Sequence, residues 1–185
     1  MIEEVLEEAE RKMKKAVETT AEEFSTIRTG RASAALLNRI NVNYYGQPTP
    51  LKQVSSISVP EPSMLLISPF DKSILGEIDK AIMQSGLGLN PANDGNVIRL
   101  PIPKLTEERR KELAKVVKAR AEDGRVAVRN VRRDGIEELR HQEKESEITE
   151  DDLRRGQEEV QRLTDRFVEE IDAMLKVKEK ELMEV

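Results

Sequence analysis

The sequence predicts an α+β protein, an elongated three-helix bundle into which a small β/α/β domain is inserted. In the outer segments, 1–30 and 106–185, about half of the residues are charged, whereas residues 31–105 hold 12 charges among 75 residues. All eight prolines also fall within 31–105. Apolar residues recur every three to four positions in the outer segments, and they alternate with polar residues in the middle one. We therefore expect one domain formed by 1–30 and 106–185, a second formed by 31–105, and two linkers between them.

The outer segments predict three helices. Residues 1–27 carry apolar or small side chains in steps of three and four, from Ile2 to Ile27. Thr106 is a plausible N-cap for a second helix that runs to about Ser146. Thr149 with Asp152 resembles a capping box and opens a third helix. The second and third helices are joined by only a few residues, so they must be antiparallel, and the first completes a bundle.

Three glycines, Gly124, Gly135 and Gly156, fall on the predicted apolar faces of the second and third helices. A glycine inside a helix costs roughly 1 kcal/mol relative to alanine. Close contact between helices is the expected compensation at all three. The same heptad pattern is also typical of an intermolecular coiled coil, which is the alternative.

The middle segment predicts a small β-rich domain. The expected elements are a strand over 40–45, a turn over 46–50, strands over 54–59 and 64–68, a helix over 72–84, a loop over 87–95 and a last strand over 97–102. Asn93-Asp94-Gly95 is a candidate left-handed turn. Pro101 and Pro103 predict an edge position for the last strand.

The composition excludes several kinds of site. The chain has 185 residues, a net charge of −5, no cysteine and one histidine, His141. Without cysteine there is no disulfide, no thiolate nucleophile and no zinc site built on sulfur. We find no constellation of nucleophile, base and oxyanion donors, so we expect neither an enzyme nor a bound metal or cofactor. The longest apolar runs are a few residues and the N-terminus is acidic, so we expect a cytosolic protein without membrane contacts.

A line of basic residues on the second predicted helix is the feature of the sequence that indicates most about function. This basic strip consists of Lys111, Lys118, Arg125, Arg129, Arg132 and Arg133. Four of its members are spaced by seven, and the strip lies on the order of 130° from the apolar face, so we expect it to face solvent. Arginine predominates over residues 125–133, and guanidinium groups bind phosphates in a bidentate manner. The strip predicts a contact surface for an RNA backbone, and the alternative is a solvated face balanced by acids such as Glu122 and Asp134.

The two linkers carry the other candidate residues. Arg28, Gly30 and Arg31 follow the first helix, where a basic residue and a glycine are also typical of ordinary helix capping. The return linker contains Pro103, Lys104 and Leu105. Two short linkers permit hinge motion but limit its range, so we expect hinges near 30–31 and 103–105.

Several stretches in the expected order resemble ribosome recycling factors (ribosome-releasing factors) of bacteria and organelles. They are residues 27–32 (IRTGRA), 44–46 (YYG), 87–91 (LGLNP), 105–110 (LTEERR), 126–133 (VAVRNVRR) and 178–182 (KEKEL). The resemblance covers the whole chain without large gaps. It implies a three-helix bundle with an inserted β/α/β domain, set like an L and similar in shape to transfer RNA.

The resemblance also implies a function. Factors of this family bind the post-termination ribosome and, with elongation factor G and GTP, split the subunits and free the messenger RNA. The bundle docks on large-subunit ribosomal RNA, and the partner hydrolyses the GTP. Carried over by motif, Arg28, Arg31, Arg129 and Arg132 become contacts to ribosomal RNA, and the regions of Gly30 and Leu105 become the hinge. We expect a monomer in the bacterial cytoplasm, with a processed organellar form as the alternative source.

Three other functions remain open at this point. A coiled-coil adaptor predicts a dimer without ribosome affinity. A free RNA chaperone predicts binding to naked RNA, which the acidic net charge disfavours. An enzyme of unknown type would need catalytic groups that the sequence lacks.

Overall fold

The computed structural model describes residues 2–184, which form two compact units. The bundle unit consists of the residues up to Phe24 together with Lys111–Met183. The sheet unit consists of Ser25–Arg110 with Glu184.

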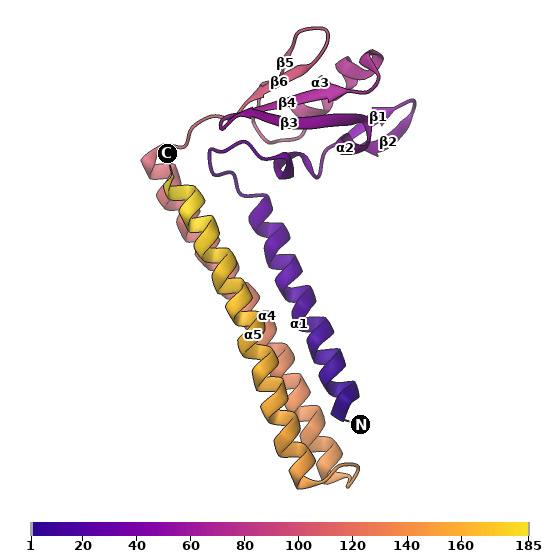
Figure 1. The fold of residues 1–185 in the computed structure, drawn as a ribbon, viewed down its shortest axis with the longest axis vertical. Helices are drawn as coiled ribbons and strands as arrows, with labels where there is room; N and C mark the ends of the chain where they lie inside the picture. Colours follow the sequence, from indigo (N-terminus) through magenta and orange to yellow (C-terminus); the bar gives the residue numbers. More distant parts are fainter. Residues whose placement is uncertain (1, 185) are drawn as a thin grey trace. The chain divides into compact units, whose positions relative to one another are not determined.

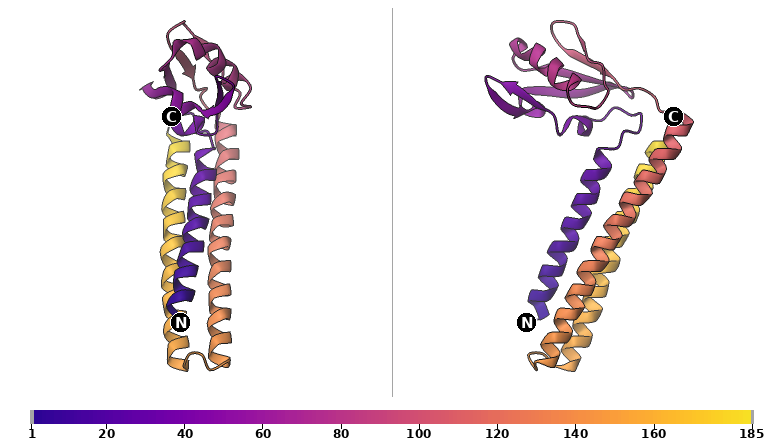
Figure 2. Two further views of the ribbon diagram at one scale, coloured as in Figure 1. Left: turned by 90° about the vertical axis from the view of Figure 1, so that its right-hand side faces the viewer. Right: turned by 180° about the vertical axis from the view of Figure 1, so that it is seen from behind.

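The bundle unit is built from three long helices, α1 (Ile2–Ser25), α4 (Glu107–Lys144) and α5 (Glu150–Met183), of which Ser25 and residues 107–110 belong to the sheet unit. They lie side by side, and α4 and α5 are antiparallel (Figures 1 and 2). Thr106 Oγ1 accepts a hydrogen bond from the Arg109 amide at 3.0 Å, which confirms the predicted N-cap of α4. The capping box of α5 is also confirmed, because Thr149 and Asp152 each accept a hydrogen bond from the other's backbone amide, at 3.0 and 3.2 Å.

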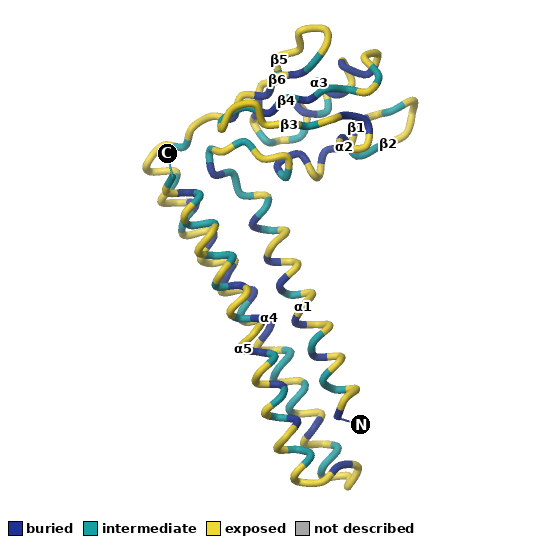
Figure 3. Tube along the Cα trace, in the orientation of Figure 1, coloured by how far each residue is buried: buried dark blue, intermediate teal, exposed yellow. Residues whose placement is uncertain are grey.

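One stripe of each helix forms the core of the bundle, and the opposite faces are exposed (Figure 3). The buried residues are Ile2, Ala9, Met13, Val17, Thr20 and Phe24 of α1, Leu113, Val117, Ala121, Gly124, Val128 and Leu139 of α4, and Gly156, Val160, Thr164, Phe167, Ile171 and Leu182 of α5. Val116, which the periodicity placed on the apolar face of α4, is 39% exposed. The stripe runs through Leu113 and Val117, and Val116 lies on its flank.

Two of the three helix glycines mark close contacts, as predicted. A methyl group added at Gly124 would overlap Oγ1 of Thr20 in α1 and lie 3.1 Å from Cδ1 of Ile171 in α5. One added at Gly156 would lie 2.8 Å from Cδ1 of Leu139. The expectation is wrong for Gly135, where the nearest atom would be 3.8 Å away, an ordinary van der Waals distance.

The sheet unit contains a four-stranded antiparallel sheet and a separate hairpin. The sheet has the order β3 (Ser55–Glu61), β4 (Met64–Pro69), β6 (Ile98–Pro101), β5 (Ala92–Asn93), and the hairpin pairs β1 (Asn41–Tyr44) with β2 (Gln47–Pro50). Short helices η1 (Ala34–Leu37), α2 (Leu51–Val54) and η2 (Lys72–Ile74) connect these strands, and η2 leads into α3 (Leu75–Met83). Inward-facing residues of β1, β4 and β6 pack with α3, α2 and η1 in one core that includes Val42, Ile67, Ile78 and Leu100.

The predicted turn over 46–50 is wrong, because β2 occupies Gln47–Pro50. The chain reverses instead at Tyr45 and Gly46, and Pro48 pairs with Asn43 in the hairpin. In a two-residue hairpin this is a position without ladder hydrogen bonds, and β2 pairs with β1 alone in its sheet. A proline costs no hydrogen bond there.

The predicted edge position of the last strand is also wrong, because β6 lies between β4 and β5. The pairing with β5 extends over Ile98 and Arg99 alone, so Pro101 lies beyond it and pairs on one side, with Met64. The proline pattern correctly indicated a position with one neighbour, but it described the end of the strand and not the strand as a whole.

The remaining differences are local. The helix expected over 72–84 begins as η2 before α3, and the loop expected over 87–95 contains the two-residue strand β5. The left-handed turn at 93–95 is confirmed, since Gly95 has a φ of 90°.

Candidate nucleic-acid interface

The basic strip lies along α4 of the bundle unit, from Lys111 to Arg133. The buried stripe of α4 fixes the rotation of this helix, and with it the direction in which each strip residue leaves the backbone. Lys111, Lys118, Arg129 and Arg133 are exposed, whereas Arg125 and Arg132 are partly buried. The expectation that the strip faces solvent is therefore confirmed for four residues and wrong for two.

The difference has a geometric cause. Seven residues advance an α-helix by about 700°, so a line of residues spaced by seven rotates by about 20° per heptad. From Lys111 to Arg132 the rotation accumulates to about 60°. The line starts on the solvent face at Lys111 and turns toward α5 by the time it reaches Arg125 and Arg132.

Arg125 joins two helices. Its side chain is 19% exposed, and its Nε donates a hydrogen bond to Oδ1 of Asp172 in α5 at 2.7 Å. Its Nη1 donates to Glu122 at 3.0 Å. Burial acts to lower the pKa of Arg125, but the hydrogen bonds to Asp172 and Glu122 outweigh it and the pKa is raised. Arg125 is thus a fixed cation that holds α4 against α5.

Glu122 also approaches Arg129, whose Nη1 lies 3.4 Å from Oε1 of the carboxylate. Glu122 therefore does balance part of the charge of the strip at Arg125 and Arg129, as the alternative interpretation expects. Arg129 is nevertheless 51% exposed, and an ion pair at this distance and exposure is weak. The guanidinium of Arg129 remains accessible to an incoming phosphate.

Arg132 points toward α5, where its Nη1 donates a hydrogen bond to Gln161 at 2.9 Å. Its Nε is buried and has no hydrogen-bond partner within residues 2–184. By contrast, the side chains of Lys118 and Arg133 form no hydrogen bond or ion pair within residues 2–184. The accessible charge of the strip is thus concentrated on Lys111, Lys118, Arg129 and Arg133.

The structure does not bring Arg28 and Arg31 onto this helix. Both belong to the sheet unit, and α1 ends at Ser25, before either of them. Arg28 is partly buried, and Arg31 is exposed and forms an ion pair with Glu184.

The two linkers are adjacent within the sheet unit. Gly30 has a φ of 80°, and a side chain there would meet the backbone nitrogen of Leu105 at 3.5 Å and the Cα of Lys104 at 3.9 Å. Pro103 is exposed. These are ordinary van der Waals distances, so it is the left-handed backbone that requires the glycine.

Sequence reasoning missed the anchor of these linkers. The Ala32 amide donates to the carbonyl of Pro62 and the Ile102 amide donates to the carbonyl of Ser63, both at 2.7 Å. Both linkers are therefore tied to the same turn between β3 and β4. It also missed Asp172 and Gln161, which fix two strip residues from a distant part of the chain, and no local signal in the sequence indicates such contacts.

The described residues contain no group of three or more His, Asp or Glu side chains able to hold a metal ion. His141 is exposed on α4. None of the helices within residues 2–184 has the length and hydropathy needed to span a membrane.

Comparisons with known proteins identify the family. The family model described as "Ribosome recycling factor" matches residues 20–183. The chain is 55% identical to the ribosome-recycling factor of Syntrophomonas wolfei over 185 residues, and 57% identical to that of Geobacillus kaustophilus, with both chains covered completely in each case.

Solved structures agree with this match. The solution structure of a ribosome recycling factor shares 45% sequence identity with the chain and superposes with a TM-score of 0.85, covering 100% of this chain and 98% of the other. A second similar chain, 40% identical with a TM-score of 0.72 and complete coverage of both, comes from models of the T. thermophilus factor and E. coli elongation factor G on the E. coli post-termination complex. The chain therefore belongs to the ribosome recycling factor family.

Proposed function

We propose that this chain binds the post-termination ribosome through large-subunit ribosomal RNA and, together with elongation factor G and GTP, splits the subunits and releases the messenger RNA. The observation that carries the RNA contact is the set of exposed cations on α4 in a chain whose net charge is −5. A chain that is 40% identical to this one comes from models of a ribosome recycling factor and elongation factor G bound to the post-termination complex.

The exposed members of the strip suit a phosphate backbone. Lys111 and Lys118 present ammonium groups, and Arg129 and Arg133 present guanidinium groups, from one helix held by two others. Because the helix is held by its neighbours, its backbone needs no ordering when these cations meet phosphates, and only their side chains lose freedom. Arg125 and Arg132 then act mainly by position, because their contacts to Asp172 and Gln161 hold α4 and α5 together beneath the contact surface.

The linkers supply the proposed movement. Gly30 and Arg31 form one hinge and Pro103, Lys104 and Leu105 the other, each beginning where the chain leaves its anchor on the β3–β4 turn. Elongation factor G would move the sheet unit about these linkers while the bundle unit stays bound to RNA. In this account GTP hydrolysis belongs to the partner, and this chain contributes binding and leverage rather than catalysis.

We infer a monomer in the bacterial cytoplasm. The apolar stripes of α1, α4 and α5 are buried against one another, so a coiled coil with a second chain would have to compete with the bundle itself. The curated relatives quoted above are bacterial.

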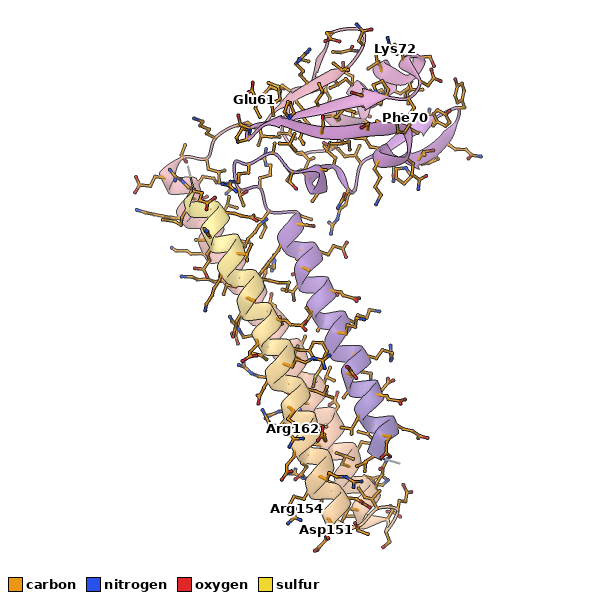
Figure 4. All side chains as sticks on the ribbon, viewed as in Figure 1. Glu61, Phe70, Lys72, Asp151, Arg154 and Arg162 are labelled. Carbon is orange, nitrogen blue, oxygen red and sulfur yellow. The ribbon has the colours of Figure 1, made fainter. Side chains whose placement is uncertain are left out.

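The RNA contact is tested with paired variants on neighbouring helices. Arg129→Gln with Arg133→Gln removes two accessible cations of the strip, while Arg154→Gln with Arg162→Gln removes two exposed cations of α5 outside it (Figure 4). Binding of labelled chain to post-termination ribosomes is measured between low and physiological salt.

We expect the strip variant to bind more weakly and to lower the slope of log K against log salt by about 2, since each lost phosphate contact lowers it by roughly 1. The α5 variant should retain the affinity and the slope of the unmodified chain. Equal affinity of the strip variant and the unmodified chain at physiological salt would remove the strip from the interface.

A further inference from the structure

The turn of the β1–β2 hairpin holds a bulky residue in a conformation that such residues avoid. Tyr45 has a φ of 49° and Gly46 a φ of 85°, the pattern of a type I′ turn. Asparagine or aspartate followed by glycine is the preferred sequence for this turn, and the left-handed region costs other residues roughly 1–2 kcal/mol. The fold would be served as well or better by a small residue here.

The same tyrosine is exposed and yet held in place. Its side chain is 74% exposed, and its hydroxyl donates a hydrogen bond to Oδ2 of Asp71 at 2.8 Å. Its ring meets that of Tyr44 edge to face, with 4.7 Å between the centroids. Phe70, beside Asp71, is 72% exposed (Figure 4). Exposed, immobilised aromatic side chains are typical of the anchor residues of protein interfaces.

These residues surround a hollow of about 280 Å³ in the sheet unit. Its lining residues, which we call the Tyr44–Phe70 hollow, are Tyr44, Thr49, Gln53, Val54, Phe70 and Asp71. Tyr45 stands at its margin through the bond to Asp71. Tyr44, Val54 and Phe70 form the apolar part of the lining, and Thr49, Gln53 and the carboxylate of Asp71 form the polar part.

We propose that the Tyr44–Phe70 hollow is a docking site for a protein partner that inserts an apolar side chain next to a lysine or arginine. The apolar side chain would pack against Val54 and the ring of Phe70, and the cation would lie near Asp71 and the face of Tyr45. The Tyr44–Phe70 hollow belongs to the sheet unit, whereas the basic strip belongs to the bundle unit. The inference rests on the proposed function only in the choice of ribosomes and elongation factor G as binding partners for its test.

The charge of the hollow favours protein over nucleic acid. Among its lining residues in the described structure, Asp71 alone carries a charge. Hydrogen bonds from the Ser73 hydroxyl, the Ser73 amide and Tyr45 lower the pKa of Asp71, so the carboxylate is ionised at neutral pH. An RNA phosphate would meet the one charge of the lining, which is negative, whereas an ammonium or guanidinium group would be attracted to it.

Tyr45→Asn separates binding from folding. Asparagine tolerates the left-handed conformation, so the variant should be at least as stable to heat as the unmodified chain. It lacks the aromatic ring and should bind its partner more weakly, by about tenfold if Tyr45 is an anchor residue. Phe70→Ser should act in the same direction, and Met83→Ser serves as the control because Met83 is 66% exposed in the same unit but does not line the hollow.

Two quantities are measured with purified components: the affinity for post-termination ribosomes, and the concentration of elongation factor G that gives half-maximal splitting. We expect Tyr45→Asn and Phe70→Ser to impair at least one of them about tenfold while Met83→Ser changes neither. If both variants match the unmodified chain in both measurements, the hollow is not a docking site. A chain that never splits ribosomes would refute the proposed function. The affinity for post-termination ribosomes, together with the affinity of elongation factor G for the chain bound to them, would still decide this inference.

Asp71→Asn identifies the class of partner. Asparagine keeps an acceptor for the Ser73 amide but removes the negative charge. A cationic protein partner should then bind several-fold more weakly, and less so at high salt. Tighter binding of Asp71→Asn would show that the hollow meets phosphates, and would overturn the proposal.

Discussion

At the scale of single residues, glycines decide how closely the three helices approach. Gly124 lies where all three meet, between Thr20 of α1 and Ile171 of α5. Gly135 lies on the same face of α4 but has ordinary contact distances to Val5 and Val160. Two glycines that look equivalent in the sequence therefore differ in what they do.

Replacing them by alanine should shift stability in opposite directions. Gly124→Ala should destabilise the bundle by about 1–3 kcal/mol, because the methyl group would overlap Thr20. Gly135→Ala should stabilise it by about 0.5–1 kcal/mol, since alanine favours the helix and the site has room. Urea unfolding followed by circular dichroism measures both, and a destabilised Gly135→Ala would show that the site is tighter than described.

A single carboxylate in the sheet unit makes a prediction about pH. Hydrogen bonds from the amides of Val97 and Asn96, and then from Arg99, lower the pKa of Asp94 from 3.8 to about 2. Because the folded pKa lies below the unfolded one, Asp94 stabilises the turn fully above about pH 4 and loses this effect as the pH falls toward about 2. We expect the side-chain carboxyl of Asp94 to titrate near pH 2 by NMR, and a midpoint near 4 would contradict the described hydrogen bonds.

At the scale of elements, α4 carries two roles on one surface. Its first half presents exposed lysines, and farther along Arg125 and Arg132 turn toward α5. The cause is the mismatch between a spacing of seven and the period of the helix. The members of the strip therefore differ in exposure: four are accessible, whereas Arg125 and Arg132 contact α5.

The contact between Arg125 and Asp172 should be measurable as a coupling energy. A double-mutant cycle with Arg125→Ala and Asp172→Ala should give about 1 kcal/mol, because Arg125 is mostly shielded from water. The exposed pair of Arg154 with Asp151 is the control and should give about 0.3–0.5 kcal/mol. Equal coupling in the two cycles would mean that Arg125 does not join the helices.

The sequence predicts well those features that depend on neighbours along the chain. The helical period, the capping box at Thr149 and the left-handed turn at Gly95 are local, and all three are confirmed. The place of β6 inside the sheet, the strand β2 and the burial of Arg125 depend on partners far away in the chain. No spacing rule indicates those partners. The predictions from the proline pattern and from the spacing of seven were therefore wrong for β2, β6 and Arg125.

At the scale of the whole molecule, two units are joined by two adjacent linkers. Gly30 needs a left-handed backbone, and Ala32 and Ile102 are tied to the same turn. If these linkers form the proposed hinge, a change at Gly30 should affect subunit splitting more than ribosome binding.

Valine and asparagine at position 30 provide a matched test. Both add a side chain near Leu105, but only asparagine readily adopts a φ of 80°. We expect Gly30→Val to bind ribosomes normally and to split them several-fold more slowly, and Gly30→Asn to retain most of the activity. Full splitting activity of Gly30→Val would refute the role of this linker.

Ribosome recycling by this chain can be measured in a single reaction. Post-termination ribosomes are mixed with the purified chain, elongation factor G and GTP, and their separation into subunits is followed by light scattering. We expect rapid splitting when all three are present, and little when the chain is omitted or carries Arg129→Gln with Arg133→Gln. Intact ribosomes in the complete mixture, under conditions where the chain is bound, would contradict it.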